Sequence, residues 1–422
     1  MSERAISVVS APDEASLAAG RTGVADALAR RLVLRQLAGL REGRLTIQEG
    51  AAAQSLGCGT PESRLVIRDP RAWRAFAFGG SIGAGESYMA GQWECDDLVG
   101  LVRLLLRNRE VLETLDGRLT GLVAPLRRVR HWLNRNTRAG SRRNIAAHYD
   151  LGNDFYRLWL DPTLMYSCAV FERPGMSLHE ASIAKLERAC NALDLKADDH
   201  VLEIGTGWGG FALHAASRYG CRVTTVTLSR EQRDLAVSRI RAAGLADRVE
   251  VRLCDYRDLR GEFDKLVSIE MIEAVGADHL DTYFRQCGRL LKPDGIMFLQ
   301  AITIADQRYE QALRNVDFIQ RHIFPGGFLP CVRAMADSIA RASDLRIVHL
   351  DDIGMHYAAT LAAWRDRFVA AIDPVRGLGF DDCFIRMWFF YLCYCEGGFL
   401  ERDLGNVQML LARPGWRPAG PG

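Results

Sequence analysis

The feature that most constrains the fold is a glycine-rich loop that joins an apolar segment to a helical one, with glycines at 205, 207, 209 and 210. Glycine permits a tight turn and lets a ligand approach the backbone, and the start of a helix offers unpaired N–H groups. From about residue 195 onward, short apolar segments alternate with helical patterns. Strands are expected at 201–204, 223–226, 249–253, 265–269 and 296–301, and helices at 211–217, 231–243 and 279–291. This alternation predicts an α/β fold with a doubly wound, mostly parallel sheet, whose ligands lie at the carboxyl ends of the strands.

The spacing of the glycines distinguishes between two nucleotide-like cofactors. The NAD fingerprint is G-x-G-x-x-G, with an acid about 20 residues later that binds the ribose. Here the glycines alternate, and the second expected strand runs into Thr225-Val-Thr-Leu-Ser229 without an acid. Acids stand instead at Glu203, before the loop, and at Asp255, after the third strand. This arrangement resembles the class I S-adenosylmethionine (SAM) methyltransferases, with their Rossmann-like sheet, and it favours a methyl donor over a hydride carrier.

The part of the chain before this sheet divides into two segments. Residues 1–112 are expected to form a smaller N-terminal α+β domain, with apolar segments at 45–47, 65–67 and 73–78 and turns at Gly79-Gly80 and Gly83-Ala84-Gly85. Residues 113–144 form a linker with eight arginines and, from Arg118 to Arg143, no acid. Leucines and valines recur between these arginines at helical spacing, which suits an anionic membrane surface. A solvated linker packed against its neighbour is an equal alternative. The third segment, 145–415, is the expected methyltransferase domain.

Composition and cysteine usage exclude several classes of protein. The 422 residues are 48% hydrophobic and 25% charged, which indicates two or more globular domains and excludes disorder and fibres. No apolar run reaches bilayer length and the N-terminus has no apolar signal core, so we expect a cytoplasmic protein. The eleven cysteines lack zinc-finger spacing and indicate reduced thiols without a metal site. Of 54 basic side chains only four are lysines, namely Lys185, Lys196, Lys265 and Lys292. No nucleic-acid partner is expected, and the oligomeric state stays open, with a homodimer among the alternatives.

Five motifs surround the glycine loop in a specific order. They are Leu160-Asp-Pro-Thr-Leu-Met-Tyr166-Ser167-Cys168, Thr227-Leu-Ser-Arg-Glu-Gln232, Ser268-Ile-Glu-Met-Ile-Glu273-Ala-Val-Gly276, Phe318-Ile-Gln-Arg-His-Ile-Phe324-Pro-Gly-Gly and His356-Tyr357. Together they resemble the cyclopropane-fatty-acyl-phospholipid synthase family, which includes the mycolic acid cyclopropane synthases. The resemblance runs from about residue 148 to 413, and the N-terminal part resembles the lipid-facing domain of bacterial members.

The resemblance implies an activity and a cofactor site. SAM donates a methylene carbon to a cis double bond of a phospholipid acyl chain, while the protein is attached peripherally to the membrane. Tyr166 and Ser167 are expected to contact the methionine part of SAM, and Thr227 and Gln232 the ribose. The remaining expected cofactor residues are Glu203, Gly205, Gly207 and Gly209 of the loop, and Asp255 and Tyr256 at the adenine.

The resemblance also implies a base. Methylation of an alkene leaves a carbocation, and a proton must then leave the new methyl group before a ring can close. In this family a bound bicarbonate is thought to accept that proton. Its expected ligands are Cys168, Glu273, Gln300, Ile302 and Tyr357, with Gln300 as a departure from the usual histidine. Cys395 matches a cysteine once proposed as the family's nucleophile and is kept as a candidate, although alkene methylation needs no covalent enzyme intermediate and favours a structural role.

Three other functions remain open. The nearest shares the methyl transfer but ends in a methyl-branched or methylene fatty acid without ring closure. A small-molecule methyltransferase explains the glycine loop but not the other motifs. A lipid-binding protein with a decayed active site belongs to a different class, and isotope transfer from SAM separates it from an enzyme.

Overall fold

The computed structural model describes residues 23–110 and 151–418, which belong to two compact units. The described residues of one unit are 151–314, 324–360 and 404–418, and those of the other are 23–110, 315–323 and 361–403. The division departs from chain order, because two late segments belong to the same unit as the N-terminal residues. The expected boundaries at 112 and 144 stay predictions, and the arginine-rich linker 113–144 lies outside the described residues.

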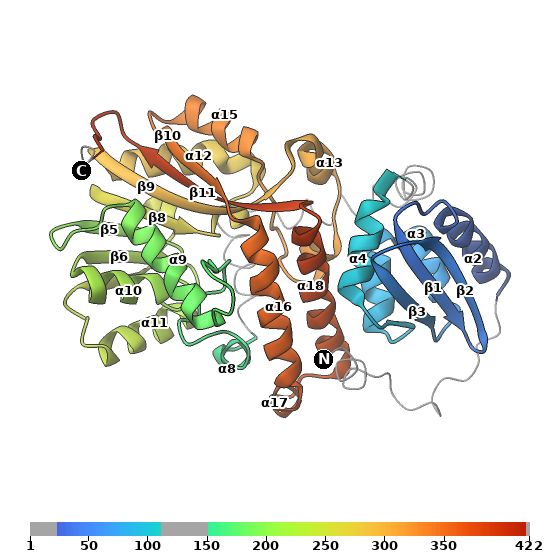
Figure 1. The fold of residues 1–422 in the computed structure, drawn as a ribbon. Coiled ribbons are helices and arrows are strands. Elements are labelled where there is room, and N and C mark those ends of the chain that lie inside the picture. The colour runs from blue at the N-terminus through green and yellow to red at the C-terminus, as the bar shows by residue number, and fades with distance from the viewer. Residues whose placement is uncertain (1–22, 111–150, 419–422) are drawn as a thin grey trace. The chain divides into compact units, whose positions relative to one another are not determined.

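The unit with the glycine loop contains a seven-stranded sheet within residues 151–418, with the order β10-β11-β9-β8-β5-β6-β7 (Figure 1). The strands are β5 (His200–Ile204), β6 (Arg222–Thr227), β7 (Val249–Leu253), β8 (Phe263–Ile269), β9 (Leu291–Ile304), β10 (Arg346–Asp352) and β11 (Leu404–Ala412). The five strands from β9 to β7 are parallel, and β11 pairs antiparallel with both β9 and β10. The predicted α/β fold with a mostly parallel sheet is confirmed, and so are the five strands.

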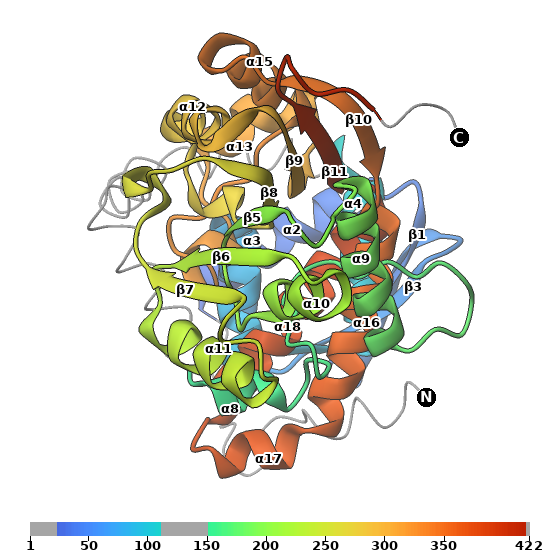
Figure 2. The same ribbon diagram turned by 90° about the vertical axis from the view of Figure 1, so that its left-hand side faces the viewer.

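Helices cover both faces of this sheet. On one face lie α9 (Leu178–Ala192), α10 (Gly210–Tyr219) and α11 (Arg230–Ala242), and on the other lie α12 (Leu280–Leu290) and α15 (Val332–Ala342). Figure 2 shows α12 on one side of the strands and α10 on the other. The three helices predicted from the sequence correspond to α10, α11 and α12. Shorter elements of this unit are α8 (Asn153–Arg157), α13 (Tyr309–Arg314) and the 3-10 turns η3 (Tyr256–Asp258), η4 (Ile272–Ala274), η5 (Ala277–His279) and η6 (Asp306–Arg308).

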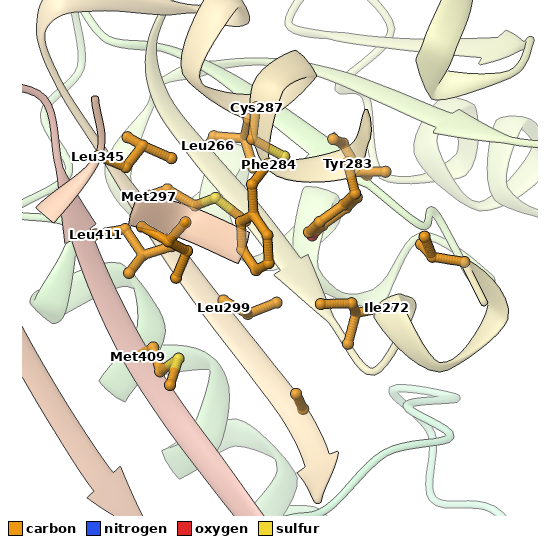
Figure 3. Packing of buried hydrophobic residues seen from close by; sticks show 14 of the residues in the cluster. Leu266, Ile272, Tyr283, Phe284, Cys287, Met297, Leu299, Leu345, Met409 and Leu411 are labelled. Atoms are coloured by element: carbon orange, nitrogen blue, oxygen red, sulfur yellow. The ribbon is translucent and has the colours of Figure 1, made fainter. Parts of the chain in front are cut away.

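The core beneath α12 follows from the spacing of its apolar residues. Cys287 lies four residues after Tyr283 and three after Phe284, so the three side chains share one face of the helix, and all are fully buried. They pack against Met297 and Leu299, which point to the same side of β9 because they are two residues apart (Figure 3). This packing fixes β8 and β9 side by side, and site residues lie directly after β8 and in the carboxyl-terminal part of β9.

The other unit has a four-stranded sheet in the order β2-β1-β3-β4 within residues 23–110. Its strands are β1 (Gly43–Glu49), β2 (Ala52–Cys58), β3 (Glu62–Ile67) and β4 (Trp93–Cys95). Its helices are α2 (Val24–Leu37), α3 (Ala72–Met89), α4 (Leu98–Arg107), α14 (Phe318–His322), α17 (Ile372–Gly377) and α18 (Asp382–Leu400), while α16 (Gly354–Ala370) crosses the boundary between the units. Mixed strands and helices in this unit fit the expected α+β character.

Of the two glycine turns expected in this unit, the one at Gly83-Ala84-Gly85 is wrong, whereas at Gly79-Gly80 the chain kinks between two helical segments. Gly79-Gly80 and Gly83-Ala84-Gly85 all lie inside α3, where Gly80 has a φ of +55° and kinks the helix. After the kink, glycine is required for packing, because a Cβ on Gly83 would lie 2.2 Å from the carbonyl oxygen of Ala75. Gly83 and Gly85 therefore mark close approach, which composition alone does not distinguish from a turn.

Across the described ranges, no helix combines the length and the apolar character needed to cross a bilayer.

Candidate active site

The glycine loop connects β5 to α10 at the carboxyl edge of the sheet. Gly205, Gly207 and Gly209 have φ angles of +107°, +51° and +83°, a region that side chains other than glycine rarely adopt. The N–H groups of Gly205 and Thr206 bond to the carbonyl of Val226 on β6, which fixes the start of the loop. Among the described residues other than its two chain neighbours, none has an atom within 4 Å of the position that a Cβ on Gly207 would take, so the loop leaves open space beside its backbone.

Glu203 lies at the end of β5 with one oxygen available to a ligand. The residue is buried, and its Oε2 has no hydrogen-bond partner among the described residues. Burial raises the pKa of its carboxyl group to about 8. A buried polar atom without a partner is costly unless a ligand or water completes it. Glu203 and the glycine cradle therefore suit a ligand that offers hydroxyl or amino groups.

The two candidates at the carboxyl end of β6 and in the first turn of α11 contact each other. Thr227 Oγ1 donates to Gln232 Oε1 over 2.9 Å, and Thr227 Oγ1 accepts from the N–H of Ser229 at 3.1 Å. Ser229 caps α11, since its hydroxyl accepts from the N–H of Gln232. Thr227 and Gln232, the two expected ribose residues, are both buried. The amide NH₂ group of Gln232 takes part in none of these three hydrogen bonds and is available to a ligand.

Asp255 and Tyr256 follow β7, as expected from the sequence. The Asp255 carboxylate is buried and already accepts from Arg257, with Nε at 2.9 Å from Oδ1 and Nη2 at 2.6 Å from Oδ2. Burial raises the pKa of the Tyr256 hydroxyl, and its ring packs edge-on against Tyr283. A carboxylate oxygen has further lone pairs, so Asp255 can accept another hydrogen bond while paired with Arg257.

Tyr166 and Ser167 are adjacent in the chain but have different surroundings, aromatic for Tyr166 and polar for Ser167. The Tyr166 ring centroid lies 5.6 Å from Tyr156, 5.5 Å from Trp159 and 6.2 Å from Phe324. The buried Ser167 hydroxyl instead accepts a hydrogen bond from Lys185 Nζ at 2.8 Å. An aromatic group of this kind provides a dry wall and ring faces that attract positive charge.

Three of the expected base-site residues converge on a side chain that sequence reasoning missed, Glu270. Its Oε1 accepts from the Cys168 N–H at 3.0 Å and from Gln300 Nε2 at 2.9 Å. Its Oε2 accepts from the Tyr357 hydroxyl at 2.8 Å. A fourth donor, Asn406 Nδ2 on β11, lies 2.7 Å from Oε1.

Elements far apart in the sequence produce this convergence. Glu270 follows β8 directly, and the register of the parallel pair sets Ile269 opposite Gln300 of β9. Gln408 Nε2 donates to Gln300 Oε1 at 2.9 Å, which leaves the Gln300 NH₂ group pointing to Glu270. Four donors thus surround the carboxylate of the partly buried Glu270, and all four belong to buried residues, namely Cys168, Gln300, Tyr357 and Asn406.

The two remaining base-site candidates contact each other. Glu273 Oε1 accepts from the Ile302 N–H at 2.5 Å, while its Oε2 is buried without a partner among the described residues. Burial, reinforced by the charge of Glu270, raises the pKa of Glu273 to about 8. Glu273 therefore carries a proton through much of the neutral range.

Cys395 belongs to the other compact unit, in α18. Burial raises the pKa of its thiol, so the nucleophilic thiolate is disfavoured at neutral pH. Its proposed catalytic role stays a prediction that nothing in its own surroundings supports.

Two signals in the sequence could have identified the missed residues. Glu270 stands directly after an expected strand, in the position where α/β enzymes place their chemistry. Lys185 is one of only four lysines in an arginine-rich chain, and it is fully buried.

Residues 23–110 and 151–418 contain no group of three His, Cys, Asp or Glu side chains that could hold a metal ion.

Comparison with known proteins adds a family and individual relatives. The sequence model described as mycolic acid cyclopropane synthetase matches residues 136–409. The chain is 39% identical over 422 residues to the tuberculostearic acid methyltransferase UfaA1 of Mycobacterium tuberculosis, covering 96% of this chain and 95% of the relative. It is 37% identical over 368 residues to the cyclopropane-fatty-acyl-phospholipid synthase of Escherichia coli K12, covering 84% and 89%. The crystal structure of mycolic acid cyclopropane synthase CmaA1 complexed with SAH and CTAB has a TM-score of 0.60 at 31% identity, covering 64% of this chain and 98% of that chain.

Proposed function

The chain belongs to the mycolic acid cyclopropane synthetase family, and from this premise we propose that it transfers a methylene group from SAM to a cis double bond of a phospholipid acyl chain, which closes a cyclopropane ring. The resemblance inferred from the five motifs is thereby confirmed at the level of the family. Membership of this family makes the chain a SAM-dependent methyltransferase that modifies lipids. The phospholipid substrate and the cyclopropane product are what we propose beyond that.

The residues around the glycine loop fit SAM. The left-handed glycines leave a backbone surface that a ligand can approach, and Glu203 offers a buried oxygen without a partner among the described residues. Thr227, Gln232 and Asp255 follow the next two strands along the same edge of the sheet. When bound, SAM supplies a methyl group activated by its positive sulfur. The related CmaA1 structure was solved with SAH, the product that remains after methyl transfer.

The single observation that carries the proposal is a hydrogen-bonded carboxylate next to the cofactor loop. A Cβ on Gly205 would lie 3.2 Å from the side chain of Met271, so the loop lies beside the segment that carries Glu270. An alkene is a weak nucleophile and gives a carbocation on methylation, which requires a dry site and a base. The aromatic group around Tyr166 supports the first requirement, and the carboxylates after β8 support the second.

A methyl-branched or methylene product is the second candidate. It is favoured by the likeness to the tuberculostearic acid methyltransferase, which extends over 96% of this chain. Both candidates need a proton to leave the methylated carbon skeleton. They differ in whether the electron pair of that C–H bond closes a ring or forms a double bond.

Peripheral attachment to an anionic membrane is part of the proposal and rests on the sequence of the 113–144 segment. Replacing Arg127, Arg128 and Arg130 by glutamine is expected to weaken binding to anionic vesicles, because each arginine near the surface contributes about 1 kcal/mol. SAM affinity is the control and should stay unchanged. Equal vesicle binding by the variant would contradict a membrane role for this segment.

The product decides between the two candidate functions. The gene is expressed in a bacterium without its own synthase, and fatty acid methyl esters are analysed by mass spectrometry. Because a ring and a methylene branch add the same mass, the esters are also hydrogenated and fragmented. A ring supports the proposal, a branched or methylene product supports the second candidate, and unmodified lipid contradicts both.

A further inference from the structure

The base site of this chain does not fit a bound bicarbonate. Cys168, Gln300 and Tyr357 direct donors to Glu270, at 3.0, 2.9 and 2.8 Å. The Ile302 N–H donates to Glu273. A bicarbonate held by the same groups would have to displace the Glu270 carboxylate from buried donors, which would leave a carboxylate without its hydrogen bonds.

We infer that Glu270 is the catalytic base, and that its side-chain carboxylate takes the place of a bound bicarbonate in the reaction. This inference rests on the proposed function and deepens it. A carboxylate and a bicarbonate share the same planar pair of oxygens, so donors arranged for one suit the other. Here the oxygens belong to the chain itself and require no dissolved ion.

The backbone at Glu270 supports this assignment. Its φ is +49°, in the left-handed region that is costly for a residue with a Cβ. The side chain is nevertheless held by four donors, one of them Asn406 at 2.7 Å. Backbone strain of this kind persists where the surrounding contacts determine the conformation, and it concentrates at functional sites.

The electrostatics suit a base at neutral pH. Burial raises the pKa of Glu270, and the hydrogen bonds from Gln300, Cys168 and Tyr357 oppose the rise. The nearby ammonium group of Lys185 also favours the ionised carboxylate. Residue 270 is partly buried, and the four donors around its carboxylate are buried.

Glu273 is the rival base, and it is held by one donor where Glu270 is held by four. One of its oxygens accepts from Ile302, and the other is buried without a partner among the described residues. Its pKa of about 8 leaves it largely protonated at pH 7, partly because of the adjacent charge on Glu270. A protonated carboxyl group cannot accept the proton from the substrate.

The chemistry balances with this base. One alkene carbon uses the π electron pair to bond the methyl carbon, whose bond to sulfur breaks with the electron pair remaining on SAH. The other alkene carbon becomes a cation. A Glu270 oxygen accepts a proton from the new methyl group, and the electron pair of that C–H bond forms the third bond of the ring. The proton later passes from Glu270 to water.

The test uses the full-length protein, vesicles of phospholipid with cis-monounsaturated chains, and SAM labelled in its methyl group. Wild-type label transfer is expected to be the same in bicarbonate-depleted and bicarbonate-containing buffer. Glu270→Gln keeps the shape but cannot accept a proton, and is expected to lose at least about 100-fold in rate. Its SAM affinity, measured by calorimetry, should stay within about twofold of wild type, since an amide replaces a carboxylate of equal size. Glu250→Gln, at a half-exposed side chain on β7, is the matched control and should keep wild-type activity.

Glu270→Gly supplies a second readout that does not depend on the glutamine variant folding well. Glycine accepts the positive φ, and the Cys168, Gln300 and Tyr357 donors become available to an anion. Activity is expected to be lost without bicarbonate and to return in part when it is added. Bicarbonate dependence of the wild type, or full activity of Glu270→Gln, would overturn the role of Glu270 as the base but would leave the proposed function intact. Absence of label in wild-type lipid under every condition would overturn the proposed function as well.

Discussion

The ammonium group of Lys185 donates a hydrogen bond to Ser167 Oγ over 2.8 Å, and both side chains are buried. Burial lowers the pKa of Lys185 to about 8, while the negative charge of Glu270 opposes the decrease. At pH 7 the lysine is mostly charged, so it bonds an expected cofactor residue and its positive charge favours the ionised carboxylate of Glu270.

Replacing Lys185 by methionine is expected to lower the free energy of unfolding by about 1–3 kcal/mol, because a buried hydroxyl loses its donor and Glu270 loses a nearby positive charge. Lys196→Met is the matched control, since Lys196 is exposed and only pairs with Asp194 on the surface. Its effect should stay within about 0.5 kcal/mol. Urea unfolding at pH 7 measures both, and equal effects would argue against a structural role for the Lys185 contact.

Replacing Gly207 by alanine is expected to reduce SAM affinity at least about tenfold, because the added methyl group enters the space beside the loop. Gly244→Ala is the control, since Gly244 also has a positive φ, +69° against +51°, and nothing within 4 Å of an added Cβ. Both variants should lose a similar stability of about 1 kcal/mol from the backbone conformation. Titration calorimetry with SAM separates them, and an unchanged affinity of Gly207→Ala would place the ligand elsewhere.

Stability should decrease as the pH rises through the pKa of Glu203. Burial raises this pKa from 4.5 to about 8, so the folded protein retains a proton that the unfolded chain has released. The stabilisation is complete below about pH 4.5 and is lost between that pH and about 8. In Glu203→Gln this part of the pH dependence, on the order of 1–4 kcal/mol, should disappear from urea unfolding curves without SAM. Glu262→Gln, at an exposed position, should keep the wild-type slope.

Gly85→Ala should destabilise the unit that contains α3. A Cβ on Gly85 would lie 2.2 Å from the ring of Phe318, closer than atoms can approach, so the expected cost is about 1–3 kcal/mol or more. Gly79→Ala in the same helix meets nothing within 4 Å and should be neutral or stabilising by up to about 1 kcal/mol. Thermal unfolding compares the two, and equal melting temperatures would contradict the close packing of Gly85.

Local patterns were sufficient for the sheet and the cofactor loop. Strands β5 to β8 and helices α10 to α12 follow from apolar periodicity, and the left-handed conformations of Gly205, Gly207 and Gly209 follow from alternating glycines. In α3 the same kind of reasoning failed at Gly83 and Gly85, because a glycine that allows close packing cannot be told from a glycine in a turn by residue type alone.

The sequence by itself determined the fold of the methyltransferase sheet, the family and the residue types available for chemistry. Only the tertiary structure decided which carboxylate the donors serve. Glu270 and Glu273 stand three residues apart in one motif, and the resemblance pointed to Glu273 alone. The choice depends on the register of β8 against β9 and of β11 against β9, which sets Gln300 and Asn406 beside Glu270 and the Ile302 N–H beside Glu273. Hydrogen-bond partners across strands depend on this long-range register, and a local sequence pattern does not specify it.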